Sequence, residues 1–91
     1  MATQNIEIEK GEWQDIVTIG ELTLTNKQTY KISVLANGES QICIADSKPE
    51  DDFAGHPIDS KSIFEYTYNT DDLIWIKLND IASDTAIVVL T

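Results

Sequence analysis

Apolar and polar residues alternate along most of this chain with a period of two. The alternation is clearest at residues 5–9, 21–25, 30–34 and 41–45. A period of two places successive side chains on opposite faces of a β-strand, whereas an amphipathic helix repeats every 3.6 residues. Few windows of the sequence carry the helical period, so the pattern predicts an all-β protein.

The alternating segments are short and lie about ten residues apart. Eight strands are predicted, at residues 5–9, 13–19, 21–25, 30–34, 41–45, 63–68, 73–78 and 85–90, with one long irregular stretch at residues 46–62. This spacing is typical of a β-sandwich or barrel. We therefore expect one domain over residues 1–91, a compact, jelly-roll-like β-sandwich of about eight short antiparallel strands.

Two hairpins have a predicted register. A three-residue turn at residues 37–39 sets Val34 opposite Ile42 and keeps one face of the hairpin apolar. The same argument, applied to residues 63–78, sets Tyr66 opposite Ile76. Because directly opposed residues share a face, register follows the face that is buried.

The last predicted strand is apolar on both faces, since residues 86–90 contain no polar side chain. Such a strand needs cover on both sides, and an apolar edge strand left bare promotes aggregation. Either this strand is central in its sheet, or its outer face meets another subunit. We expect Ile87 and Val89, together with Trp75 and Leu73, at an interface, either within a homodimer or homotrimer or with a partner protein.

Charge narrows the range of partners. The 91 residues include 16 acids, 6 lysines and no arginine, which gives a formal net charge of −10. Nucleic-acid binding depends on Lys and Arg replacing counterions at phosphates, so this balance excludes DNA, RNA and anionic lipid. We expect no membrane span, because the longest apolar run is far below the roughly 20 residues needed. We also expect no signal peptide.

The residues that could perform chemistry form no catalytic pattern. Cys43 is the single cysteine, so it can form neither an internal disulfide nor a structural zinc site. His56 shares a loop with Ser60 and Ser62, but nothing in the sequence fixes the geometry that nucleophilic catalysis needs. We expect no catalytic residue, no metal and no cofactor.

The acid-rich residues 46–52 do not fit an EF-hand, because its third ligand position falls on Lys48. A solvated loop of mutually repelling carboxylates is the simpler interpretation. The alternative is an irregular calcium site formed by residues 50–52 with Asp71 or Asp72.

The two tryptophans are candidates for recognition. Trp75 can serve as an interface anchor, as part of the core or as a platform on which a sugar ring stacks. Trp13 is interpreted as a core residue or as cover for a sheet edge.

Several short motifs follow one another from Trp13 onward. They are Trp13 with Ile16, Leu24 with Tyr-Lys-Ile at 30–32, Ile-Cys-Ile-Ala-Asp-Ser at 42–47, Gly-His-Pro-Ile at 55–58, Phe-Glu-Tyr-Thr at 64–67 and Leu-Ile-Trp-Ile-Lys at 73–77. In this order they resemble the head-fibre and capsid-decoration proteins of tailed bacteriophages. The resemblance implies a β-sandwich that attaches to a capsid or tail as a dimer or trimer and catalyses no reaction. The acidic residues 46–59 and the absence of arginine depart from it.

The sequence thus favours a non-enzymatic structural component of a virion that acts by docking to other virion proteins. Two alternatives belong to other classes. One is a carbohydrate-binding or adhesin module that uses an exposed Trp75. The other is an acidic anti-host effector that mimics nucleic acid and binds a basic protein.

Overall fold

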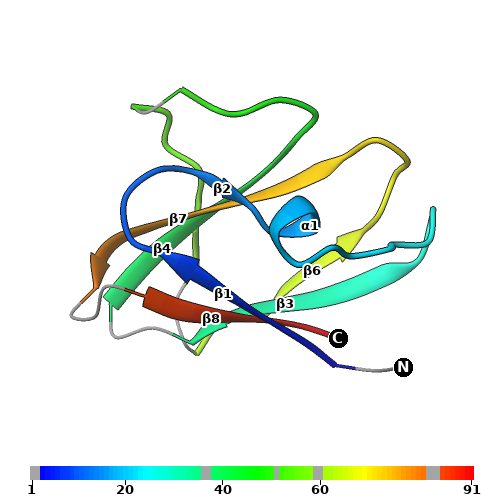
Figure 1. Ribbon diagram of the computed structural model, residues 1–91, viewed down its shortest axis with the longest axis horizontal. Helices are drawn as coiled ribbons and strands as arrows, with labels where there is room; N and C mark the ends of the chain where they lie inside the picture. The colour runs from blue at the N-terminus through cyan, green and yellow to red at the C-terminus, as the bar shows by residue number, and fades with distance from the viewer. Residues whose placement is uncertain (1–2, 36–37, 51, 59–60, 82–84) are drawn as a thin grey trace.

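The computed structural model describes residues 3–35, 38–50, 52–58, 61–81 and 85–91, which form two antiparallel four-stranded sheets (Figure 1). Sheet A contains, in spatial order, β1 (Gln4–Glu9), β8 (Thr85–Leu90), β3 (Thr29–Leu35) and β6 (Phe64–Thr67). Sheet B contains β2 (Gln14–Asp15), β7 (Leu73–Ile81), β4 (Gly38–Ala45) and β5 (His56–Ile58). Within the described ranges one short helix, α1 (Ile16–Ile19), joins β2 to the segment before β3.

The chain changes sheet at almost every connection. Only β4 and β5 follow each other within one sheet, and every other pair of consecutive strands is divided between sheets A and B. Two packed sheets joined in this way form the double Greek key of a jelly roll. The all-β sandwich predicted from the sequence is therefore confirmed.

The two predicted hairpins are wrong. β3 and β4 lie in different sheets, and Val34 is opposite Val88 rather than Ile42. β6 and β7 are divided in the same way, so Tyr66 is opposite Tyr30 and has no pairing with β7. Burial requires only that the apolar side chains of both strands face one core. Strands that pack across the core meet this requirement as well as paired strands do.

β-Branched side chains dominate the core between the sheets, because they suit the pleated, half-buried surface of a strand. Its buried members are Ile6, Ile8, Ile16, Tyr30, Ile32, Val34, Ile42, Ile58, Ile74, Ile76, Leu78, Ala86, Val88 and Leu90. Every described strand except the two-residue β2 and the short β6 contributes at least one of them. The core thus contains side chains from both the first strand, β1, and the last strand, β8.

The strand predicted at residues 13–19 is right only at its start, where β2 lies, and the strand predicted at residues 21–25 is wrong. β2 stops after Asp15, because the Asp15 carboxylate accepts hydrogen bonds from the Val17 N–H, at 3.0 Å, and from the Thr18 hydroxyl, which caps α1. Residues 22–25 have the alternation of a strand but pair with none, and their leucines pack on the core. Conversely, β5 lies inside the stretch that was predicted to be irregular.

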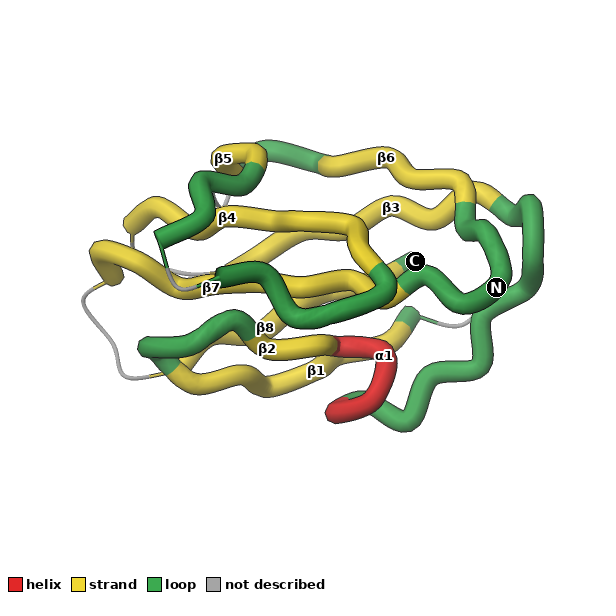
Figure 2. The backbone as a smooth tube through the Cα atoms, turned by 90° about the horizontal axis from the view of Figure 1, so that it is seen from above, coloured by secondary structure: helices red, strands yellow, loops and turns green. Residues whose placement is uncertain are grey.

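The two open sides of the sandwich are closed differently (Figure 2). On the side of β1 and β2, α1 inserts the fully buried Ile16, and a Cβ atom at Gly20 would lie 2.7 Å from the Ile6 Cγ1. On the side of β5 and β6, the rings of His56 and Phe64 meet with centroids 5.5 Å apart. The only helix in the described part of the chain is too short to span a membrane.

Candidate functional site

β8 lies in the middle of sheet A, paired with β1 on one side and with β3 on the other. Its Ala86, Val88 and Leu90 belong to the core, whereas Ile87 and Val89 point outward and are half-buried. The structure therefore places this strand centrally, the first of the two arrangements that its apolar sequence allows. Its outer side chains still face away from the core.

An apolar patch occupies the centre of the outer face of sheet A. Ile87 is opposite Leu35, whose side chain is 52% exposed, and Val89 is the next outward residue along β8. We call these three residues the β8 patch. On the β1 side, Glu7 is opposite Ile87 and Asn5 is opposite Val89, so polar side chains border the patch. An apolar centre with a polar rim is the usual composition of a protein–protein contact surface.

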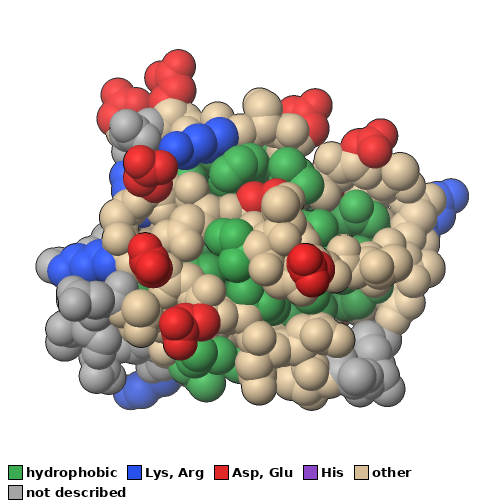
Figure 3. All heavy atoms as spheres, viewed as in Figure 1, with side chains coloured by type: hydrophobic (Ala, Val, Ile, Leu, Met, Phe, Trp, Pro, Cys, Tyr) green, Lys and Arg blue, Asp and Glu red, His purple; other side chains and the backbone are tan. Residues whose placement is uncertain are grey.

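The acidic side chains of the described residues are spread over the face that Figure 3 shows. On the face of the molecule shown in Figure 3, Asp and Glu lie scattered around a band of apolar side chains. On sheet A, Lys31 is directly opposite Glu65 and lowers the negative charge there. The negative charge on the face shown in Figure 3 is therefore dispersed.

Trp75 and Leu73 lie on the outer face of sheet B. Trp75 is opposite Cys43 on β4, and Leu73 is opposite Ala45. The indole N–H of Trp75 donates a hydrogen bond to the backbone carbonyl of Ala45 at 3.2 Å, which holds the half-buried ring in one orientation. Burial raises the pKa of the Cys43 thiol, so this cysteine is less reactive than a free one.

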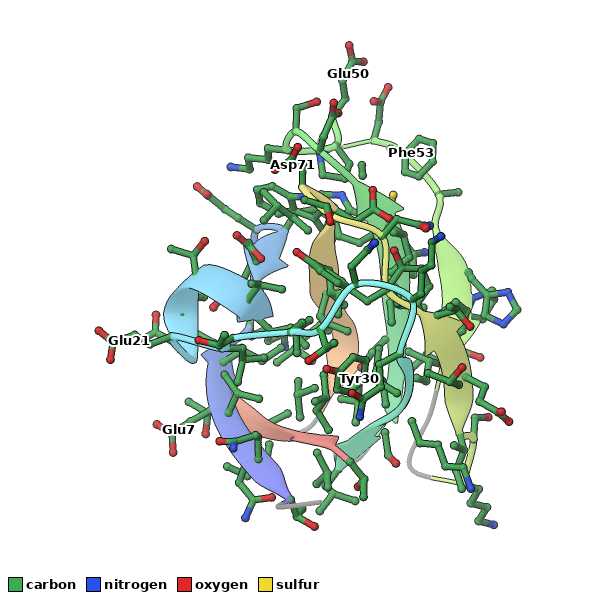
Figure 4. The ribbon with its side chains drawn as sticks, turned by 90° about the vertical axis from the view of Figure 1, so that its right-hand side faces the viewer. Glu7, Glu21, Tyr30, Glu50, Phe53 and Asp71 are labelled. Carbon is green, nitrogen blue, oxygen red and sulfur yellow. The ribbon has the colours of Figure 1, made fainter. Side chains whose placement is uncertain are left out.

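A loop crosses this outer face. The connection from β4 to β5 runs over sheet B on the side away from β1 and β8 (Figures 1 and 2). We call its described residues, 46–50 and 52–55, the strap. Figure 4 shows Glu50 and Phe53 of the strap at the opposite end of the molecule from Glu7 on β1.

Three contacts join the strap to the rest of the molecule. The Lys48 Nζ lies 2.9 Å from the Glu12 Oε2, and this pairing holds the pKa of the Glu12 carboxyl below its usual value. The ring of Phe53 packs against that of Trp13, with centroids 6.3 Å apart. The Gly55 N–H donates to the side-chain oxygen of Gln41 at 3.3 Å.

Glycine is required at the last of these contacts. A Cβ atom at position 55 would lie 2.8 Å from the Ile42 carbonyl oxygen and 2.8 Å from the Trp13 ring. Neither neighbour can move cheaply, because one is backbone in a central strand and the other is a buried ring. Gly55 thus lets the strap approach sheet B closely.

The predicted interface residues fall into two separate groups. Ile87 and Val89 lie on the outer face of sheet A, while Trp75 and Leu73 lie on the outer face of sheet B. The two faces are on opposite sides of the core, so the structure does not unite the four residues in one surface. Sequence reasoning missed Leu35, because the predicted hairpin paired residues 30–34 with residues 41–45 and not with β8.

The other sequence candidates are dispersed. The described residues contain no group of three or more His, Cys, Asp and Glu side chains suited to a metal, and Asp51, Asp59 and Ser60 lie outside the described residues. Asp72 accepts a hydrogen bond from the Tyr66 phenol, and burial together with this bond raises the pKa of Tyr66 to about 12. The exposed His56 packs on Phe64, as described above.

A shallow hollow of about 270 Å³ lies at one end of the sandwich, between residues 22–25 and β3. Uncharged side chains line it, among them Gln4, Gln28 and Tyr30. The Tyr30 hydroxyl accepts a hydrogen bond from the Thr25 N–H at 2.8 Å, which fixes part of the wall. The hollow is remote from the strap and contains none of the predicted interface residues.

No protein-family model, curated protein or solved structure matches this chain.

Proposed function

We propose that this chain is a non-enzymatic structural component of a virion, of the capsid-decoration or head-fibre type. Copies of the chain pair through the β8 patch, and the pair attaches to other virion proteins at the capsid or tail. The observation that carries this proposal is the β8 patch itself, which places the exposed Leu35 beside the half-buried, outward-facing Ile87 and Val89 at the centre of the outer face of sheet A.

The physical support comes from position and rigidity. Leu35, Ile87 and Val89 stand on strands whose inner side chains are fully packed, so docking loses little side-chain and backbone freedom. Burying apolar side chains at the centre of a contact supplies most of its free energy, while the polar border excludes wrong partners. Pairing also presents two attachment surfaces to a particle, which strengthens binding through avidity.

Co-sedimentation tests this function. Virus particles are purified from cells that express the chain and are banded in a density gradient. The chain is then detected in each fraction of the gradient. We expect the wild-type chain to band with the particles and the Val89→Asp variant to remain mostly at the top. Thr85→Asp is the matched control, because it adds the same charge to the same strand and face outside the patch. A wild-type chain that never bands with particles contradicts the proposal.

A carbohydrate-binding function is the second candidate, and one observation favours it. The hydrogen bond from the Trp75 indole to Ala45 fixes an aromatic ring on the outer face of sheet B, as a stacking platform requires. For this alternative we expect the tryptophan fluorescence of the chain to change when a saccharide is added. The change should be absent in Trp75→Ala, which retains Trp13.

A further inference from the structure

Trp13 carries a polar group that its surroundings do not satisfy. The side chain is only 2% exposed, and its Nε1 is buried with no hydrogen-bond partner among the described residues. A buried N–H without an acceptor costs free energy, and such groups in native proteins call for an explanation. An acceptor atom brought by a ligand would satisfy this donor.

Trp13 and Trp75 share the outer face of sheet B. Asp15 is opposite Trp75, so the alternation of side chains along the chain puts Trp13, two residues earlier, on the same face. Trp13 is also absent from the core cluster, although it is as buried as the members of that cluster. Its cover comes from the strap, through Phe53 and Gly55.

The strap is held by weak contacts. The Lys48–Glu12 pair is solvent-exposed, with side chains 45% and 76% accessible, and exposed ion pairs of this kind contribute little to stability. Phe53 is 48% exposed, and the Gly55–Gln41 hydrogen bond is long at 3.3 Å. Segments with few buried contacts open locally at low free-energy cost, while the core stays folded.

The face beneath the strap has a defined chemistry. It contains two indole rings, and Gln41 and Lys77 lie directly opposite each other on β4 and β7. Flat apolar rings stack on the C–H faces of sugar rings, while amide, ammonium and indole N–H groups hydrogen-bond to hydroxyl and ring oxygens. The acids Glu12 and Asp15 beside Trp13 disfavour an anionic ligand.

We infer that the outer face of sheet B is a binding site for an uncharged oligosaccharide, which enters when the strap lifts from Trp13. One sugar ring stacks on Trp13, while a neighbouring sugar of the chain accepts a hydrogen bond from Nε1, whose N–H lies in the plane of the indole. Trp75 offers the second stacking surface. This site is on the opposite side of the core from the β8 patch, so it is independent of the docking proposed above.

The test follows the two indole N–H resonances in ¹H–¹⁵N NMR spectra of the full chain, assigned with Trp75→Phe. Cellohexaose, maltohexaose and chitohexaose are each titrated into the wild type and into Lys48→Ala. We expect the Trp13 resonance to shift saturably with at least one of them. Lys48→Ala raises the apparent affinity by about two- to fivefold, because it removes one exposed ion pair from the closed state. Lys31→Ala, on sheet A, is the matched control and leaves the affinity unchanged.

One further variant separates binding from folding. Trp13→Phe keeps a ring but removes the N–H, so the saccharide is followed at the Trp75 indole resonance. We expect the shift of that resonance to weaken in Trp13→Phe while the spectrum stays folded. Decaproline, a peptide, is titrated as a ligand of another class. The inference is overturned if no saccharide moves the Trp13 resonance in Lys48→Ala, including the case in which decaproline moves it instead. It is also overturned if Lys31→Ala and Lys48→Ala change the affinity equally. Because the docking proposal is tested by co-sedimentation and by the Val89→Asp substitution on sheet A, failure here leaves that proposal standing.

Discussion

The two outer faces of this sandwich are built in opposite ways. Sheet A is open, and its central strand displays Ile87 and Val89 beside the exposed Leu35. Sheet B is crossed by a loop that buries Trp13 almost completely. The aromatic ring of Trp13 on sheet B is thus buried, whereas the aliphatic β8 patch on sheet A is in contact with solvent. The difference shows that the strap has a structural task, since it covers Trp13 on the outer face of sheet B.

The two outer faces also suit two different ways of binding a partner. The open face is rigid and preformed, so it suits docking that costs little reorganisation. The covered face first needs a segment to lift, so a ligand there is bound only as often as the strap is open. Each face therefore predicts a different response to substitution.

The largest effect is expected at Trp13. Trp13→Ala removes a fully buried ring and detaches the strap, so we expect a loss of about 3 kcal/mol in the free energy of unfolding. Trp75→Ala removes a half-buried ring from the same face and should cost about half as much. Urea denaturation followed by circular dichroism measures both. Equal losses for the two variants would mean that the strap does not cover Trp13.

A smaller loss is expected at Gly55. Gly55→Ala places a methyl group against the Ile42 carbonyl and the Trp13 ring, and this overpacking should cost about 1–3 kcal/mol. The neighbouring Ala54→Ser adds one atom at an exposed position and serves as the control. Acrylamide quenching of Trp13 in a Trp75→Phe background should increase in Gly55→Ala. An unchanged stability and quenching constant would show that the close approach of the strap is not needed.

The smallest effect concerns pH. The pKa of Glu12 is lowered in the folded chain by Lys48, so the stabilisation from this contact is present above the ordinary pKa of 4.5 and is lost as the pH falls through the lower, folded value. Quenching of Trp13 should therefore rise as the solution is acidified below about pH 4. Glu12→Gln should show the raised quenching already at pH 7, with no further step of this origin. If quenching depends on pH in the same way in the wild type and in Glu12→Gln, the Glu12–Lys48 ion pair does not hold the strap over Trp13.

The sequence predicted the class of fold but not its connections. Alternation at β1, β3 and β4 reports directly on a strand with one face in the core, and β8 was visible as an uninterrupted apolar run. All four strands lie close to their predicted bounds. Alternation carries no information on which strand is the neighbour, so the jelly-roll pairing of β3 with β8 could not be read from it. At residues 13–19 a local cap by Asp15 overrode the strand pattern.

Site residues were predicted with the same limits. Ile87 and Val89 were identified because an uninterrupted apolar run is visible in sequence, whereas Leu35 joins them only through the pairing of β3 with β8. The cover over Trp13 was invisible, because it depends on a loop whose composition indicates solvation. Gly55 was the one available signal, as an isolated glycine can mark a close approach of backbone to a neighbouring element.

Molecular mass in solution, measured by light scattering over a range of concentrations, tests the central claim that the open face of sheet A is the docking surface. We predict that the wild-type chain forms a dimer at high concentration. We also predict that Val89→Asp weakens the association by at least about a hundredfold, since it places a charge in an apolar contact. The variant should remain folded, and Thr85→Asp should retain the dimer. A wild-type chain that stays monomeric at every concentration, or a dimer that Val89→Asp leaves undiminished, would contradict the account.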